Sequence, residues 1–272
     1  MPGLSVVDGT PRDCASPACG SEGDTSIIRE RELGIKRASA LGRTNANGPV
    51  DAAAAIATFM GNPGNSTAAK RLKRAPKGSL LSDLLGGNRG NNKNDDNGGG
   101  DDDDDGAAIA DGSKTHGTVE TGVKAAAGTD ATSGLPTCSD DGTISVTYHQ
   151  VNQDGAGPLT AMIDPTSGGT DPSAFQKPKV IQDVPGIGVA GHSSAKITDF
   201  PVKVQMPEGM TCTGTAGEAS NVCILRVNNK ALAGPFCGSA AFTQSPAAQK
   251  RTLEYRMRRR HSARGIVRGS SE

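Results

Sequence analysis

The chain has 272 residues, of which 34% are hydrophobic and only 3% aromatic, and it contains 37 glycines, 16 prolines and no tryptophan. So much Gly and Pro with so few aromatic side chains excludes a single compact core that uses the whole chain. The 29 basic and 29 acidic residues cancel, which removes a whole-chain electrostatic argument for nucleic acid, and no run of 18 apolar residues predicts a membrane span.

The first 60 residues contain one clear helix signal. Asp51 precedes an alanine-rich run that ends at Met60 and is followed by Gly61. Aspartate accepts hydrogen bonds from the free N–H groups of a first helical turn, and glycine often ends helices because it adopts the left-handed conformation. We therefore predict a short helix over 51–60, and we assign residues 1–60 to the N-terminal part of a folded domain.

The composition changes sharply after residue 60. Residues 61–134 are rich in Gly, Asn, Asp, Ala and Lys and include the acidic run Asp101–Asp105. Such a segment cannot bury enough apolar surface to offset the entropy of ordering it, so we predict a long disordered insert. Asn65, in the sequence Asn65-Ser-Thr, is a candidate glycosylation site if the chain is exported.

Residues 135–246 have a strand pattern. In 143–151 polar and apolar residues alternate, which puts Ile144 and Tyr148 on one face and His149 on the other. Frequent turn signals separate several such short runs, as is typical of a sandwich or barrel. We predict an all-β, immunoglobulin-like sandwich formed by 135–246 with contributions from 1–60. The further strands that we predict cover 159–163, 179–184, 200–205, 222–227 and 240–243.

The final segment, 247–272, is strongly basic. Such a run is typical either of a solvated helical tail or of a nuclear signal or nucleic-acid patch. Tyr255 is the only aromatic residue among the cations, and the chain has no recognisable nucleic-acid-binding fold. We therefore interpret 247–272 as a solvated basic tail, with no nucleic acid as partner.

Six cysteines form an even set, which is typical of disulfides in an oxidising compartment. No pair has the C-x-x-C spacing of a zinc site. Cys212 and Cys223 lie on either side of a glycine-containing loop, so we predict that they bridge its flanking strands. We expect Cys14 or Cys19 to pair with Cys138. The six disulfide candidates are Cys14, Cys19, Cys138, Cys212, Cys223 and Cys237.

Catalytic motifs of the common hydrolases and nucleotide-binding enzymes are missing from the sequence. Residues 186–191 match G-x-G-x-x-G, but no βαβ unit surrounds them, so we interpret them as a loop. Of four histidines, His149 is the one on a predicted strand. A neutral imidazole there is a candidate metal ligand, and the alternative is a partly exposed histidine that bonds a turn carbonyl.

Several runs of the sequence are informative together. They are Val7–Cys14, Ala40–Asn45, His149–Pro158, Val184–Gly186, Phe200–Pro207, Met210–Cys212, Asn221–Cys223 and Ala233–Phe236. These runs resemble a family of secreted fungal proteins associated with appressoria, which is called Gas/Mas in rice blast and Egh-like in powdery mildew. The resemblance covers residues 1–60 and 135–265 and skips the insert.

This resemblance implies an extracellular protein without an established enzymatic activity or cofactor. Family members usually carry a signal peptide and a mature chain that begins with His-Gly. Because this chain shows neither, we expect Met1 to be an internal residue of a longer reading frame. The resemblance to lytic polysaccharide monooxygenases, whose mature N-terminal histidine and a second histidine hold one copper ion, makes His149 before Gly157-Pro158 a possible copper ligand in that longer protein.

The leading hypothesis is a secreted, non-enzymatic surface or host-interface protein associated with appressorium penetration and virulence. Its expected partner is cell-wall polysaccharide or a surface protein. The alternative is a copper-dependent enzyme that cleaves polysaccharide oxidatively. A third hypothesis, an intracellular nucleic-acid binder, rests on the basic tail alone.

Overall fold

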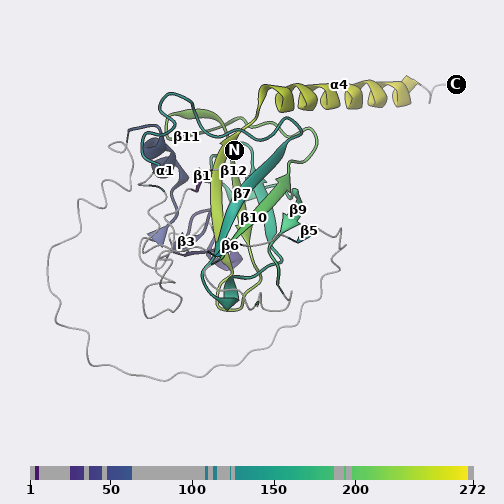
Figure 1. Ribbon diagram of the computed structural model, residues 1–272. Helices are drawn as coiled ribbons and strands as arrows, with labels where there is room; N and C mark the ends of the chain where they lie inside the picture. The colour runs from purple at the N-terminus through teal and green to yellow at the C-terminus, as the bar shows by residue number, and fades with distance from the viewer. Residues whose placement is uncertain are drawn as a thin grey trace, which may run out of the picture.

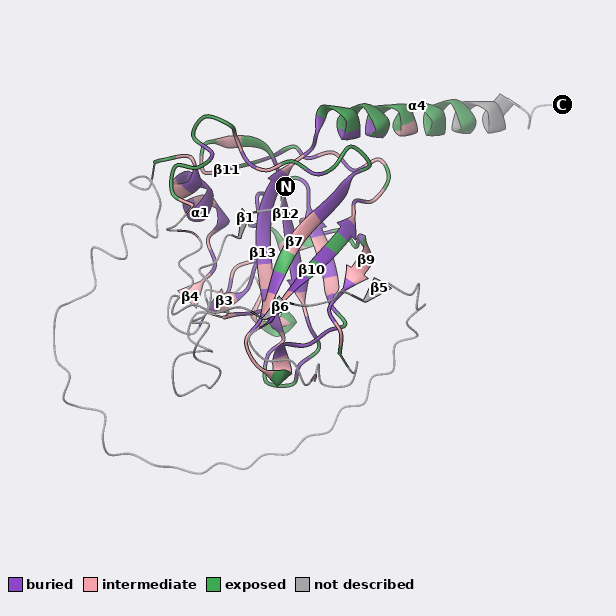
Figure 2. Cartoon of the chain, viewed as in Figure 1, coloured by how far each residue is buried: buried purple, intermediate pink, exposed green. Residues whose placement is uncertain are grey.

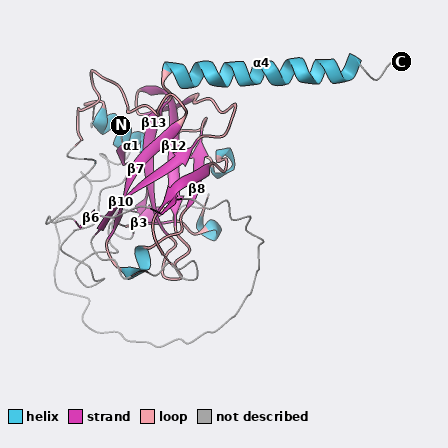
Figure 3. Ribbon diagram, turned by 45° about the vertical axis from the view of Figure 1, so that its right-hand side comes forward, coloured by secondary structure: helices cyan, strands magenta, loops and turns pink. Residues whose placement is uncertain are grey.

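The computed structural model describes residues 4–5, 25–33, 37–44, 48–62, 108–109, 113–114, 123, 126–186, 193 and 198–268. Within these residues the chain forms two sheets that face each other, with a helix on one outer face and a long helix at the C-terminus (Figures 1 and 3). The all-β sandwich that the sequence predicts is therefore confirmed, with two α-helices added to it.

The larger sheet is built around β12 and β13, which pair antiparallel from Val222↔Thr243 to Asn228↔Cys237. Strand β13 also pairs with both N-terminal strands β1 and β2, so the two ends of the chain meet in one sheet. The strands of this sheet are β1 (Leu4–Ser5), β2 (Ser26–Ile27), β3 (Arg43–Thr44), β4 (Gly48–Pro49), β8 (Thr160–Asp164), β11 (Gly214–Ala216), β12 (Ala219–Asn228) and β13 (Phe236–Thr243).

The smaller sheet is centred on β10, which pairs antiparallel with β7 over its whole length and with β9 and β6 on its other side. β5 pairs parallel with β9 at the edge. The strands are β5 (Ala108–Ile109), β6 (Ser113–Lys114), β7 (Thr143–Gln150), β9 (Lys179–Asp183) and β10 (Thr198–Gln205). The strands predicted over 143–151, 179–184 and 200–205 are all present.

The main core lies between the two sheets. Strand β10 shows why: Phe200, Val202 and Val204 are buried and alternate with exposed residues, because side chains of a strand point to opposite faces in turn. Leu225 of β12 and Phe242 of β13 meet them from the larger sheet. Figure 2 shows the buried stretches of these central strands in purple.

A second apolar layer covers the outer face of the larger sheet. Helix α1 (Ala52–Phe59) begins at Asp51, whose side chain accepts a hydrogen bond from Ala54 N at 3.0 Å, as the sequence predicts. Ile56 and Phe59 are fully buried against the sheet. The helix lies so close to the β11–β12 turn that a Cβ at Gly217 would meet a helix carbonyl at 2.3 Å, which requires glycine there.

Arg226 of β12 is buried in this outer layer. Its guanidinium stacks 4.3 Å above the Phe175 ring and donates to Ala40 O at 2.6 Å. Burial lowers the pKa of this guanidinium. The side chain therefore ties the N-terminal segment to the central sheet.

Most of the predicted insert, including Asn65 and Asp101–Asp105, lies outside the described residues. Its last part is folded: residues 126–134 form turns against the end of α1, where Gly128 N donates to Thr58 O at 3.0 Å and Asp130 N donates to Phe59 O at 3.1 Å. The described fold therefore resumes before residue 135, where composition alone places the boundary.

Helix α4 (Pro246–Arg268) follows β13 and runs away from the sheets, with most of its described side chains exposed (Figures 1 and 2). The helical tail expected for 247–272 is therefore present over most of that range. Among the helices of the described residues, none has the length and apolarity needed to cross a bilayer.

The structure contains a disulfide between Cys212 and Cys223, the pairing that we expected. The expected bond from Cys138 to Cys14 or Cys19 is wrong, because Cys138 is a free thiol. It is buried in the main core, and burial raises its pKa. Cys237 is also free and buried, and Cys14 and Cys19 lie outside the described residues.

Candidate functional site

The His149–Pro158 run, on which the family resemblance mainly rests, begins with the last two residues of β7 and continues as the loop that follows this strand. Asn152 caps the short 3-10 helix η4 (Gln153–Gly155) by accepting a hydrogen bond from Asp154 N at 3.2 Å. Gln150 is fully buried and donates to Asn152 O at 2.8 Å. These polar side chains hold the loop in one shape, which indicates a structural role.

Asn229 connects this loop to the segment before β13. Its buried amide donates to Asp154 O at 2.7 Å and to Ala156 O at 3.2 Å. Its carbonyl oxygen accepts from Ala231 N at 3.2 Å and Phe236 N at 3.0 Å. One side chain therefore joins two of the sequence runs that carry the resemblance.

The third run, Val184–Gly186, packs directly on the same loop. A Cβ at Gly186 would lie 2.0 Å from Gly157 O, so only glycine fits the contact. Asp183 is buried and accepts hydrogen bonds from Leu159 N at 3.0 Å and Val184 N at 2.7 Å. Burial raises the pKa of this carboxyl, and the two backbone N–H groups partly oppose that rise.

His149 pairs with a carboxylate on the neighbouring strand, a partner that neither the metal-ligand interpretation nor its alternative names. Its Nδ1 lies 2.6 Å from Asp199 Oδ1, because the two residues are directly opposite on β7 and β10. The side chain is only 12% exposed, so it is more buried than a surface imidazole. Cross-strand pairs of this kind stabilise sheets, and the pair fixes the orientation of the imidazole ring.

The described residues around His149 do not fit a copper centre that needs two histidines and a terminal amine. Within the described parts of the chain, no three His, Cys, Asp or Glu side chains gather where they could hold a metal ion. His192 lies outside those parts, and His261 is exposed on α4. The copper hypothesis therefore stays a prediction.

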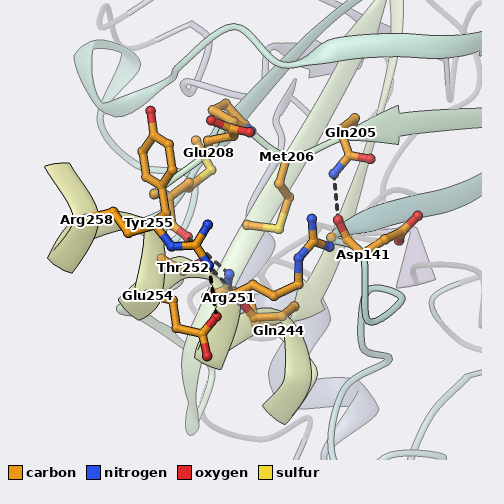
Figure 4. A pocket seen from close by; sticks show the side chains of 15 residues that line it. Asp141, Gln205, Met206, Glu208, Gln244, Arg251, Thr252, Glu254, Tyr255 and Arg258 are labelled. Carbon is orange, nitrogen blue, oxygen red and sulfur yellow. Dashed lines mark hydrogen bonds and ion pairs between the residues drawn. The ribbon is translucent and has the colours of Figure 1, made fainter.

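A pocket lies at the opposite end of β7, between the base of α4 and the loops around Thr143 and Pro207 (Figure 4). Its volume is about 190 Å³. Met206 and Met210 are among its apolar lining residues. The polar side chains that line it are Asp141, Gln205, Glu208, Gln244, Arg251, Thr252, Glu254, Tyr255 and Arg258.

Hydrogen bonds fix the base of α4 over this pocket. Thr252 donates from its hydroxyl to Met210 O at 3.1 Å, and Arg256 donates from Nε to Gly209 O at 2.8 Å. Gln244, just before the helix, donates to the same Met210 carbonyl at 3.1 Å and is buried. The base of α4, which lies on one side of the pocket, is thus attached to the loop with Gly209 and Met210, which also lines it.

The residues that line the pocket include arginines and carboxylates as well as uncharged hydrogen-bond donors and acceptors. Gln205 donates to Asp141 O at 2.8 Å, and Arg258 lies 3.9 Å from Glu254 across one helical turn, as the dashed lines in Figure 4 show. Hydrogen bonds from the backbone N–H and the hydroxyl of Thr143 lower the pKa of Asp141, so this group is a carboxylate at neutral pH. Such a surface can bind a polar, hydroxyl-rich ligand.

Sequence reasoning missed this pocket because it treated 247–272 as solvated. One signal was present: Ala248, Thr252 and Tyr255 follow each other at spacings of four and three residues, which puts them on one face of a helix. The structure shows that this face packs on the domain: Ala248 and Thr252 are buried, and Tyr255 is half-buried.

Comparison with known proteins gives the family. A family model described as "Egh16-like virulence factor" matches residues 1–237, which end before α4 begins. A Pyricularia oryzae protein named "Appressoria-specific virulence factor GAS2" is 54% identical over 98% of this chain and 86% of its own length. Another, "Appressoria-specific virulence factor GAS1", is 37% identical over 46% of this chain and 50% of its own length. No solved structure matches the chain. The chain belongs to the Egh16-like virulence factor family.

Proposed function

We propose that this chain is a virulence factor of fungal infection structures that acts outside the cell by binding, without catalysis, to cell-wall polysaccharide. The observation that carries the proposal is the 54% identity, over nearly the whole chain, to a protein named as an appressoria-specific virulence factor. Membership of the Egh16-like virulence factor family supports the same role.

The pocket beneath α4 is the binding site in this proposal. Sugar hydroxyls both donate and accept hydrogen bonds, and Gln205, Thr252 and Tyr255 supply partners of both kinds. At about 190 Å³ the pocket is smaller than the roughly 300–1,000 Å³ of typical small-molecule sites. It therefore suits a short stretch of a polymer that continues along the surface, and a surface protein is the competing partner.

A sedimentation assay with isolated cell walls and purified insoluble polysaccharides tests the proposal. The protein should be recovered from the culture medium of the fungus and should sediment with at least one polysaccharide. Tyr255→Ala should weaken that binding, whereas Leu253→Ala, on the exposed side of the same helix, should not. A secreted protein that sediments only with wall proteins, and not with polysaccharide, would contradict the proposed ligand.

A further inference from the structure

A second hollow adjoins the pocket on the outer part of α4. Glu208, Gly209 and Tyr255 line both, and Arg256, Arg259 and Arg260 complete the second. The volume of this hollow is about 400 Å³. It is therefore a continuation of the proposed binding surface along the helix, beyond the edge of the sheets.

The two hollows differ in charge. The pocket has two arginines and three carboxylates among its lining residues, whereas the outer hollow has three arginines and one carboxylate. The whole chain carries no net charge, so this excess of positive charge comes from the basic segment 247–272 and not from the protein as a whole. We name it the arginine hollow.

The cations of the arginine hollow are available to a ligand. Arg256 Nε donates a hydrogen bond to Gly209 O, but a carbonyl oxygen does not neutralise the charge of the guanidinium. Among the described residues, no carboxylate lies within 4.0 Å of Arg259 or Arg260, and both are exposed. In contrast, Arg258 in the neighbouring pocket already has Glu254 at 3.9 Å.

We propose that the arginine hollow binds an acidic polysaccharide whose sugar units carry carboxylates. This inference rests on the proposed function and names the class of its ligand. A guanidinium matches a carboxylate with two parallel hydrogen bonds, and residues three and four apart on a helix are neighbours on its surface. Arg256, Arg259 and Arg260 therefore present a row of cations to a polymer with repeated carboxylates.

Continuity with the pocket favours a polysaccharide over an anionic membrane, because Tyr255 lines both hollows. Leu253 and Met257 are 52% and 58% exposed. At about 100° per residue, Leu253 lies only about 20° around the helix from Arg260. Apolar side chains next to cations also suit an anionic membrane surface, so phosphatidylserine vesicles form one arm of the test.

The test compares polygalacturonate, as a carboxylated polymer, with xyloglucan, as a neutral one, using the full chain. The double variant Arg259→Gln/Arg260→Gln removes two exposed cations of the hollow, and its polygalacturonate affinity should fall about tenfold, a loss at the upper end for two solvent-exposed ion pairs. Arg31→Gln/Arg37→Gln is a matched control: it makes the same charge change at two exposed arginines of the N-terminal segment, and affinity should stay within about twofold. In the wild type, salt should weaken polygalacturonate binding and leave xyloglucan binding unchanged.

Three outcomes would overturn the inference. Equal binding of both polymers, insensitive to salt and to the hollow variant, would reject the acidic ligand and leave the proposed polysaccharide binding intact. Binding to neither polymer, nor to any other wall polysaccharide, would reject both. Arginine-dependent binding to phosphatidylserine vesicles without binding to polygalacturonate would assign the hollow to a membrane and reject the inference.

Discussion

Removal of the Asn229 side chain should destabilise the fold strongly. It is fully buried and its amide makes hydrogen bonds of 2.7, 3.2, 3.2 and 3.0 Å to the backbone of two loops. A typical intramolecular hydrogen bond contributes about 1 kcal/mol net, and buried groups left without a partner cost more. We therefore expect Asn229→Ala to lower the free energy of unfolding by about 4 kcal/mol.

Urea denaturation followed by far-ultraviolet circular dichroism measures this loss, because the chain has no tryptophan to report on unfolding. Asn228→Ala is the control: the neighbouring amide is half-buried and makes one long contact of 3.5 Å, so its loss should cost less than about 1 kcal/mol. If the two variants differ by less than about 1 kcal/mol, Asn229 does not hold the loops together and the reasoning is refuted.

Three further changes test other parts of the fold. Replacing both Cys212 and Cys223 by alanine removes the disulfide between two residues that are 11 positions apart in the sequence. In urea denaturation this double variant should have a free energy of unfolding about 3 kcal/mol lower than the wild type, and an unchanged midpoint would contradict a stabilising disulfide. Glu32 accepts a hydrogen bond from Arg43 Nε at 2.7 Å, which lowers the pKa of its carboxyl, so the fold gains stability from the charged form of Glu32. Glu32→Gln should therefore be less stable than wild type at pH 7, and thermal melts should show this deficit vanishing as pH falls through the lowered pKa. Gly186→Ala should cost about 3 kcal/mol by overpacking, whereas Gly238→Ala, whose added Cβ meets its nearest atom at 4.0 Å, should melt close to wild type.

The longer strands could be predicted because each carries its own pattern. In β10 a buried side chain follows every exposed one, so local sequence is enough to place the strand and its inner face. Helix α1 was predictable for a similar reason, since Asp51 caps it and Gly61 follows it. The two-residue strands β3 and β4 are too short to show any period, and they form through pairing with neighbours.

The pocket beneath α4 could not be predicted in the same way. Asp141 and Tyr255 come from distant parts of the chain, and the contacts of Thr252, Arg256 and Gln244 with the loop at Gly209 and Met210 bring them to one surface. The partner of His149 was also missed, because the register of β7 against β10 decides that Asp199 stands opposite it. Local patterns give the face of a residue, whereas its neighbour depends on how strands are aligned.

The central position of β13 has a consequence for biosynthesis. This strand, Phe236–Thr243, lies near the end of the chain, yet β1, β2 and β12 all pair with it. A ribosome must therefore release almost the whole polypeptide before the larger sheet can close, and until then the earlier strands have open edges that can pair with other chains. A premature stop before residue 236 would leave a chain that cannot complete its sheet, so the cell must protect the nascent protein until its last strand is made.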